Sequence, residues 1–160
     1  MQGKELVQLL KKLPLELPRV EYAALVRRQD GGGYLVEFPD LPGCLTEGDT
    51  LEGALTNAAE ALSGWLFVAI KTNQHVPVPT VRRGRNYHRV EPALDVTLPL
   101  LILWARKSRG LTQLQMARSL GVTQQAYRKF EIPGKSNPRL KTLSRLFDTL
   151  GLTLELRPVA

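Results

Sequence analysis

A single cysteine, Cys44, stands in a chain of 160 residues, so no disulfide can form within the chain. That composition suits a reducing compartment, and we expect a cytoplasmic protein. Long apolar runs are also missing: the longest, around residues 98–105, ends at Arg106, short of the roughly 18–20 residues that a membrane span needs. The N-terminus lacks an uninterrupted apolar core with a small-residue cleavage site, which argues against secretion. We therefore expect a soluble globular protein with no membrane partner.

Lysine and arginine are absent from residues 29–70, a stretch that holds seven acids. Residues 1–91 carry equal numbers of basic and acidic side chains, eleven of each. Residues 92–160 carry eleven basic and four acidic side chains, which accounts for the whole net charge of +7. The C-terminal part should be attracted to polyanions, whereas the acidic stretch should repel them. These opposite preferences indicate two different partners.

The residues that usually build metal or catalytic sites are few and scattered. His75 and His88 flank a proline-rich stretch with no cysteine nearby, an improbable arrangement for a metal site. Cys44 follows a glycine in a turn and has no histidine close in sequence, so we interpret it as a packed residue and not a nucleophile. A two-metal nuclease needs carboxylates that converge on facing strands, but the candidates fall mostly in turns: Asp30, Glu37, Asp40 and Asp49. We expect no catalytic residue, no metal and no cofactor.

Residues 20–91 predict an antiparallel sheet with one packed helix. Four strands are expected, at residues 20–29, 33–39, 44–48 (a short strand or edge) and 87–92. The glycines at 31–33 favour a hairpin because they adopt positive φ at little steric cost. A helix is expected from about Leu51 to Lys71, capped by Asp49 or Thr50, with Glu52 near its positive end. Its predicted buried face comprises Leu51, Leu55, Ala58, Leu62, Trp65, Leu66 and Ala69.

Residues 92–160 predict an all-helical domain with a short terminal strand at 152–159. Thr112 is a natural N-cap, and Gly121 can take the left-handed conformation that turns the chain sharply. Thr123 then caps the next helix, and Ala117 is small where two helices cross. Flanking helices are expected at 98–108 and 139–150, and the predicted core includes Leu114, Val122, Leu140 and Leu146. This order predicts a helix-turn-helix.

The helix after the turn carries the side chains that read DNA bases. Tyr127 and Phe130 should face the core, and the exposed set is Gln124, Gln125, Arg128 and Lys129. Glutamine can bond adenine bidentately, and arginine or lysine can bond guanine. We predict that these four contact base edges in the major groove of double-stranded operator DNA.

The run Thr112-Gln113, Ala117, Gly121, Thr123-Gln124-Gln125 and Glu131 resembles the phage-repressor (Xre-type) helix-turn-helix. This resemblance implies that a second set contacts phosphates: Gln113, Thr123, Lys135, Ser136 and Asn137. Phosphate contacts position a protein and base contacts specify its sequence, so the two sets should respond differently to mutation. Because one such motif reads only a few base pairs, we expect a homodimer or a higher homo-oligomer.

The N-terminal segment Phe38-Pro39-Asp40-Leu41-Pro42-Gly43-Cys44, the turn Gly48-Asp49-Thr50 and an Ala-rich helix with Asn57 resemble the HicB antitoxin family. The resemblance covers about residues 20–91. It implies a partial ribonuclease-H-like fold without nuclease activity, and a HicA-like toxin, a small basic ribonuclease, as partner. An acidic face that mimics phosphate would steer such a partner. The candidate toxin contacts are Asp40, Leu41, Leu45, Glu47, Asp49 and Glu52.

These observations predict an α+β chain with three parts: an N-terminal extension at 1–19, a toxin-binding domain at 20–91 and a DNA-binding domain at 92–160. We expect a non-enzymatic antitoxin that neutralises an mRNA-cleaving toxin and represses its own operon. Two alternatives remain open: a transcriptional regulator whose N-terminal domain senses a small molecule, and an active ribonuclease-H-like nuclease. For any one acid, solvation of a loop or capping of a helix is the competing explanation, above all for Asp49.

Overall fold

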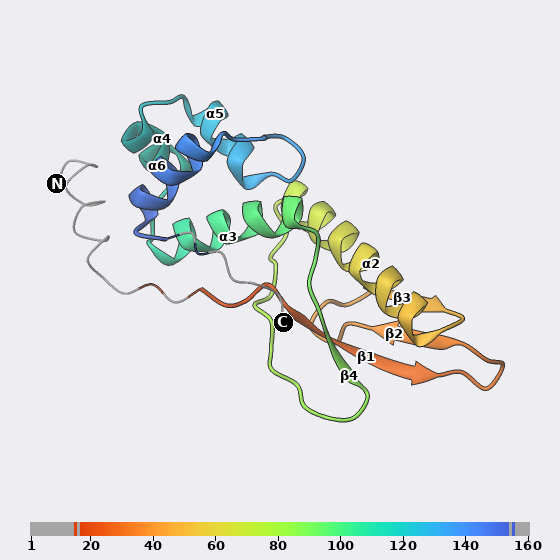
Figure 1. Cartoon of the computed structure of the whole chain (residues 1–160). Helices are drawn as coiled ribbons and strands as arrows, with labels where there is room; N and C mark the ends of the chain where they lie inside the picture. Colours follow the sequence, from red (N-terminus) through yellow and green to blue (C-terminus); the bar gives the residue numbers. More distant parts are fainter. Residues whose placement is uncertain (1–14, 16, 154, 156–160) are drawn as a thin grey trace. The chain divides into compact units, whose positions relative to one another are not determined.

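The computed structural model describes residues 15, 17–153 and 155. Two compact units make up the chain: Pro18–Leu98 form one, and the other contains the residues from Pro99 onward. The division falls inside helix α3 (Leu94–Ser108), which contains Pro99 (Figure 1). Most of the predicted extension 1–19 lies outside the described residues.

The first unit is built on a four-stranded antiparallel sheet with the order β3-β2-β1-β4. Its strands are β1 (Tyr22–Arg28), β2 (Tyr34–Glu37), β3 (Leu45–Gly48) and β4 (Tyr87–Val90). All four predicted strands are therefore confirmed, and β3 is an edge strand. The predicted hairpin is confirmed too: Gly32 and Gly33 have φ of 97° and 79°, and Gln29 N–H donates to the Gly33 carbonyl at 3.1 Å.

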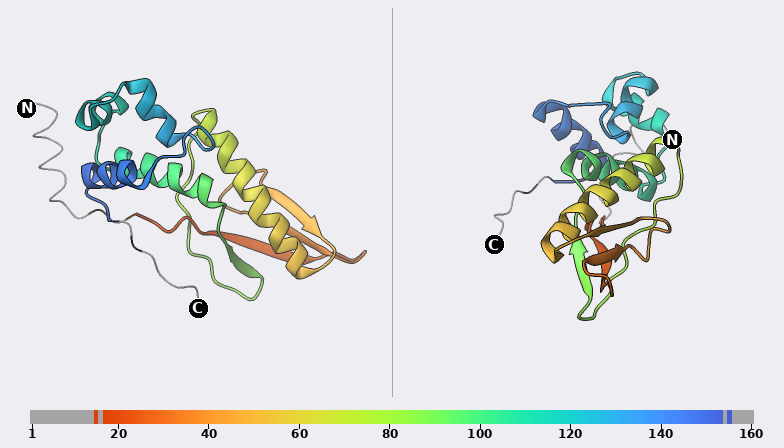
Figure 2. Two further views of the ribbon diagram at one scale, coloured as in Figure 1. Left: turned by 45° about the horizontal axis from the view of Figure 1, so that its top comes forward. Right: turned by 90° about the vertical axis from the view of Figure 1, so that its right-hand side faces the viewer.

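Helix α2 (Leu51–Lys71) lies along one face of this sheet, with the bounds that the sequence predicted (Figure 2). Its cap is Thr50, whose side chain accepts a hydrogen bond from Gly53 N–H, while Asp49 is an exposed neighbour and not the cap. The buried face comprises Ala54, Ala58, Leu62, Leu66, Ala69 and Ile70. Leu51, predicted to be buried, is exposed. By length and composition α2 could cross a membrane, but core helices of globular units pass the same test, and this one packs on a sheet.

One residue sets how closely α2 approaches the sheet. Gly48 ends β3, and a Cβ placed on it would lie 2.6 Å from the backbone nitrogen of Ala54. Asn57 on α2 donates a 2.9 Å hydrogen bond to the carbonyl of Glu47 and ties the same strand to the helix. Gly48 and this hydrogen bond therefore keep β3 and α2 in close contact.

The second unit is helical and confirms the class predicted for it. After α3 come α4 (Gln113–Leu120), α5 (Gln124–Arg128), a 3-10 turn η1 (Lys129–Glu131) and α6 (Leu140–Leu150). The first helix begins at Leu94 and not at 98 as predicted. Of the predicted terminal strand, Leu152, Thr153 and Glu155 are described, and none lies in a strand.

Three of the predicted core residues of the second unit are wrong: Leu114, Val122 and Leu140 are exposed, Leu140 by 71%. In α4 the buried stripe runs through Met116, Ala117 and Leu120, which leaves Leu114 on its flank. Burial in helices this short is decided by the neighbouring helices, which periodicity alone does not locate. Leu146 is buried, as predicted.

Candidate nucleic-acid interface and acidic surface

The turn between α4 and α5 has the geometry that the sequence predicted. Thr112 and Gln115 form a reciprocal capping box at the start of α4. Gly121 ends that helix in the left-handed conformation, with φ of 70°, and Val122 N–H donates to the Ala117 carbonyl at 3.0 Å. Thr123 then caps α5 by accepting a hydrogen bond from Ala126 N–H. Capping groups at both ends of the turn thus fix the helix-turn-helix.

The helix that follows the turn exposes the predicted base-contacting set. Gln124, Gln125, Arg128 and Lys129 are all exposed, with Lys129 in the 3-10 turn that continues the helix. Tyr127 on the opposite side is fully buried, and its ring meets that of Phe130 edge-on at 6.2 Å. The structure therefore leaves these four polar side chains available for contact with DNA.

A buried carboxylate holds this helix in place. Glu131 is only 2% exposed and accepts hydrogen bonds from Arg106 on α3 (2.5 Å at Nε) and from the Tyr127 hydroxyl (2.7 Å). Burial, and then the charge of Glu131, raise the pKa of the Tyr127 phenol far above its usual range. Burial alone would lower the pKa of the Arg106 guanidinium, but the hydrogen bonds to Glu131 and its charge raise that pKa, so the guanidinium stays protonated. Glu131 was predicted only as part of the helix-turn-helix motif, and no local sequence signal indicates this role.

The predicted phosphate-contacting residues divide into two groups. Lys135, Ser136 and Asn137 are exposed in the loop before α6. Thr123 and Gln113 are already engaged within the chain: Thr123 caps α5, and Gln113 Nε2 donates to Glu131 at 2.9 Å. A primary amide nitrogen carries two hydrogens, so Gln113 keeps one for a second acceptor.

Charge on this unit is strongly one-sided. Between residues 99 and 153, which are all described, Asp148 is the only exposed acid, because Glu131 is buried. The exposed cations of the same range are Lys107, Arg118, Arg128, Lys129, Lys135, Arg139, Lys141 and Arg145. This surface is suited to a polyanion.

Two of the predicted toxin contacts, Asp40 and Leu41, instead make contacts within the first unit. The Asp40 side chain is 7% exposed and accepts hydrogen bonds from Thr80 N–H (2.8 Å), the Thr80 hydroxyl (2.7 Å) and Arg82 (2.9 Å). Burial alone would raise the pKa of this carboxyl, but the bonds from Thr80 and Arg82 hold it below its usual range. Leu41 is fully buried. We therefore correct both assignments: Asp40 anchors the 73–86 loop, and Leu41 belongs to the core.

The other four candidates lie on the surface around β3 and the start of α2. Leu45 is 57% exposed, and Glu47, Asp49 and Glu52 are exposed as well. No lysine or arginine falls among residues 29–70, so this part of the surface has only acidic charge from its own sequence. It can bind a cationic partner and repel nucleic acid.

Periodicity also missed a surface feature beside these residues. Trp65 and Val68, on the flank of α2 that faces β3, line a groove of about 370 Å³ together with Leu45. Trp65 was predicted to be buried but is partly exposed, and its indole Nε1 donates to the Pro42 carbonyl at 3.2 Å. The sequence pattern does not predict this exposure, because it depends on how much of the flank of α2 residues 42–45 cover in the folded unit.

The remaining candidates do not form a site in the described part of the chain. Among those residues no three His, Cys, Asp or Glu side chains are grouped so that they could hold a metal ion. Glu37 pairs with Arg27 and Asp40 with Arg82, so the carboxylates considered for a nuclease do not converge. Cys44 is buried, as predicted, and burial raises the pKa of its thiol to about 11. A thiol with that pKa is a poor nucleophile at neutral pH.

Comparison with known proteins gives two family matches. Residues 22–89 match the HicB-like antitoxin of bacterial toxin–antitoxin systems, and residues 102–156 match a helix-turn-helix family. The two matches cover the sheet with α2 and the helices around the turn, respectively.

Proteins that are similar to this chain over most of its length are also named HicB antitoxins. The chain is 31% identical to antitoxin HicB 1 of Photorhabdus laumondii over 88% of both chains. It is 33% identical to antitoxin HicB of Escherichia coli over 59% of this chain and 67% of the relative. The crystal structure of the Burkholderia pseudomallei antitoxin HicB superposes with a TM-score of 0.41 and 21% identity, covering 61% of this chain and 92% of that one.

Proposed function

The chain belongs to the HicB antitoxin family, and from this premise we propose that it neutralises a HicA-like, mRNA-cleaving toxin and represses its own operon. The chain is an antitoxin-family protein with a DNA-binding helix-turn-helix. The proposal adds the identity of the toxin, the operator as the DNA target, a non-enzymatic and cytoplasmic mode of action, and a homodimer or higher homo-oligomer as the DNA-bound form.

One observation supports the proposal above the others: a single chain joins an acidic surface to an exposed recognition helix. The stretch 29–70 contains seven acids and no cation, whereas Asp148 is the sole exposed acid of the fully described range 99–153. A basic ribonuclease is attracted to the first surface and DNA to the second. The two partners can therefore bind to separate units of one molecule.

Repression would use the exposed side chains of α5 and of the 3-10 turn that continues it. Gln124 and Gln125 can pair with adenine, and Arg128 and Lys129 can pair with guanine. Lys135, Ser136 and Asn137 lie in an exposed loop where they can contact phosphates. A dimer would place two such helices on half-sites that are separated by one or two helical turns of DNA.

Co-expression tests both activities at once. The reading frame that adjoins the gene for this chain is expressed alone, then with the wild-type chain, then with the double variant Gln125→Ala/Lys129→Ala. We expect toxicity alone, rescue by both forms of the chain, and repression of the operon promoter by the wild type only. If neither form rescues growth and no complex co-purifies, the antitoxin assignment fails. If a small molecule instead releases the wild type from DNA, the ligand-sensing alternative is favoured.

A further inference from the structure

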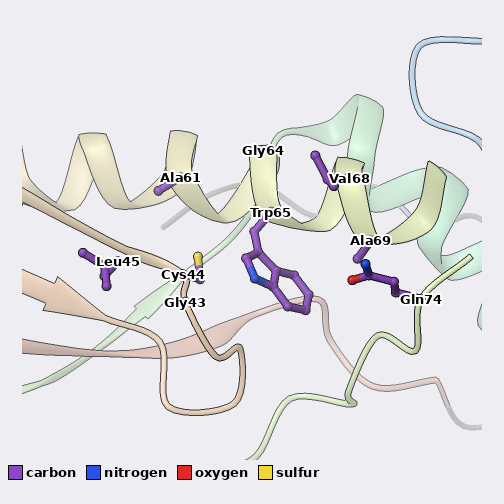
Figure 3. A pocket seen from close by; sticks show the side chains of 9 residues that line it. All are labelled: Gly43, Cys44, Leu45, Ala61, Gly64, Trp65, Val68, Ala69 and Gln74. Atoms are coloured by element: carbon purple, nitrogen blue, oxygen red, sulfur yellow. The ribbon is translucent and has the colours of Figure 1, made fainter. Parts of the chain in front are cut away.

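The groove beside α2, here called the α2 groove, lies wholly within the first unit. Its helix side is made by Ala61, Gly64 and Val68, and its other side by Cys44 and Leu45 (Figure 3). Val68 is 54% exposed and Leu45 57%, although both are large aliphatic residues. Ala61 and Gly64 have small side chains or none, so the space next to the helix stays open. The groove is thus open, mostly apolar in its lining apart from Gln74, and about 370 Å³ in volume.

The wall opposite α2 is held in place before any partner binds. Trp65 reaches from the helix to the loop, and its indole donates to the Pro42 carbonyl at 3.2 Å (Figure 3). Within the loop, Cys44 N–H donates to the Leu41 carbonyl at 2.9 Å, and Phe38 N–H donates to the Cys44 carbonyl at 3.0 Å. A preformed apolar groove of this kind binds a side chain without the entropic cost of ordering its walls.

The charges beside the groove select the kind of partner. Glu60 precedes Ala61 on α2 and is exposed, and Glu47 lies two residues after Leu45 on β3 and is exposed. The first cation after residue 28 is Lys71, at the end of the helix, where its ammonium lies 5.8 Å from the centre of the Phe67 ring. A mostly apolar groove whose lining residues Leu45 and Ala61 have exposed carboxylates close to them in sequence favours an apolar side chain that is flanked by lysine or arginine.

We infer that the α2 groove receives an apolar anchor residue, flanked by basic residues, from the toxin. The inference rests on the proposed function and locates its contact surface. An apolar anchor in a preformed groove with charged surroundings has the anatomy of a binding hot spot: a dry centre and a charged rim. Leu45 and Val68 form the centre, and Glu47 and Glu60 the rim.

Gly64 allows a test that separates docking from folding. A Cβ at this position meets no atom within 4 Å, and the residue lies inside a helix, where leucine is more favourable than glycine. Gly64→Leu should therefore fold at least as stably as the wild type while its side chain occupies the groove. Val68→Arg adds a bulky cation to the same place. Val81→Arg is the matched control, because Val81 is an exposed valine of the same unit that does not line the groove.

The measurement is the affinity of each full-length variant for the protein product of the adjoining reading frame, by titration calorimetry, with thermal unfolding in parallel. We expect Gly64→Leu and Val68→Arg to weaken binding at least tenfold at an unchanged or raised unfolding temperature, and Val81→Arg to stay within twofold. Wild-type affinity in Gly64→Leu overturns the inference alone. No binding by the wild type overturns the proposed function and the inference with it. If both groove variants instead change only the self-association of the chain, its own second copy occupies the groove and the inference is wrong.

Discussion

Gln113 Nε2 donates a 2.9 Å hydrogen bond to Oε2 of Glu131, so the first residue of α4 is fastened to a carboxylate that is buried behind α5. The same carboxylate accepts from Arg106 on α3 and from Tyr127 on α5. One buried carboxylate therefore connects three helices, α3, α4 and α5. The side chain that we expect to touch a DNA phosphate is oriented by the group that also holds α5, so we expect changes at Glu131 to affect both the stability of the unit and its DNA binding.

Removing the cation from this network should be costly. Arg106→Ala leaves Glu131 as a buried charge without its ion-pair partner, and such changes cost about 3–5 kcal/mol of unfolding free energy. The double variant Arg106→Met/Glu131→Met removes both charges and should be less destabilised than the single one. Urea unfolding gives both values when it is followed by Trp104 fluorescence in a Trp65→Phe background, since Trp104 lies in α3. A double variant that loses at least as much as the single one would contradict this view of the pair.

Two glycines on or beside α2 should respond in opposite directions to alanine. At Gly48 the added Cβ would lie 2.6 Å from the Ala54 nitrogen, so β3 and α2 must separate, at roughly 1–3 kcal/mol. At Gly64 the Cβ meets nothing, and alanine should stabilise the helix by about 0.5–1 kcal/mol. Thermal unfolding that is followed by Trp65 fluorescence measures both. Equal stability of the two variants would mean that the close contact at Gly48 does not exist in solution.

The elements that could be predicted from the sequence are those with local signals. Thr112, Gly121 and Thr123 each act on backbone groups within five residues, and all three behave as expected. Alternation and the glycine turn gave the strands in the same way. The order of strands in the sheet has no such signal, and periodicity did not separate buried from exposed leucines in the short helices α4 and α6.

The candidate sites likewise include one part with a local sequence signal and other parts without one. The exposed set on α5 follows from helix geometry, because Tyr127 fixes which side faces inward. The use of Asp40 could not be predicted, since its partner Thr80 is 40 residues away in a loop without regular structure. The α2 groove could not be predicted from the sequence either, because it depends on how much of α2 residues 42–45 leave uncovered.

Asp40 should make the first unit sensitive to acid. Its pKa in the folded chain is lowered, so its stabilising effect is complete above the unfolded value of about 3.9 and is lost as the pH falls through the folded value. Asp40→Asn should reduce the free energy of unfolding at pH 7 by on the order of 1 kcal/mol. The loss is this small because Arg82 is exposed, so that solvent screens its charge. The gap to the wild type should then narrow as the pH falls below the unfolded value towards the lowered pKa of the folded chain. Urea titrations across this range check it, with the exposed Glu60→Gln as control; a constant gap would rule out the carboxylate as its source.

The two classes of DNA contact should separate by their dependence on sequence. Gln125→Ala or Lys129→Ala removes a proposed base contact and should cost about 1–3 kcal/mol on the operator but little on shuffled DNA, so that specificity falls. Lys135→Ala removes a proposed phosphate contact and should weaken both DNAs alike, with a salt dependence that is shallower by about one counterion. Fluorescence anisotropy with the promoter fragment and a shuffled fragment, at several salt concentrations, measures these changes, and Lys71→Ala on the other unit is the control. Equal losses on both DNAs for all three variants would show that α5 binds only the DNA backbone, and the recognition role of Gln125 and Lys129 would then be wrong.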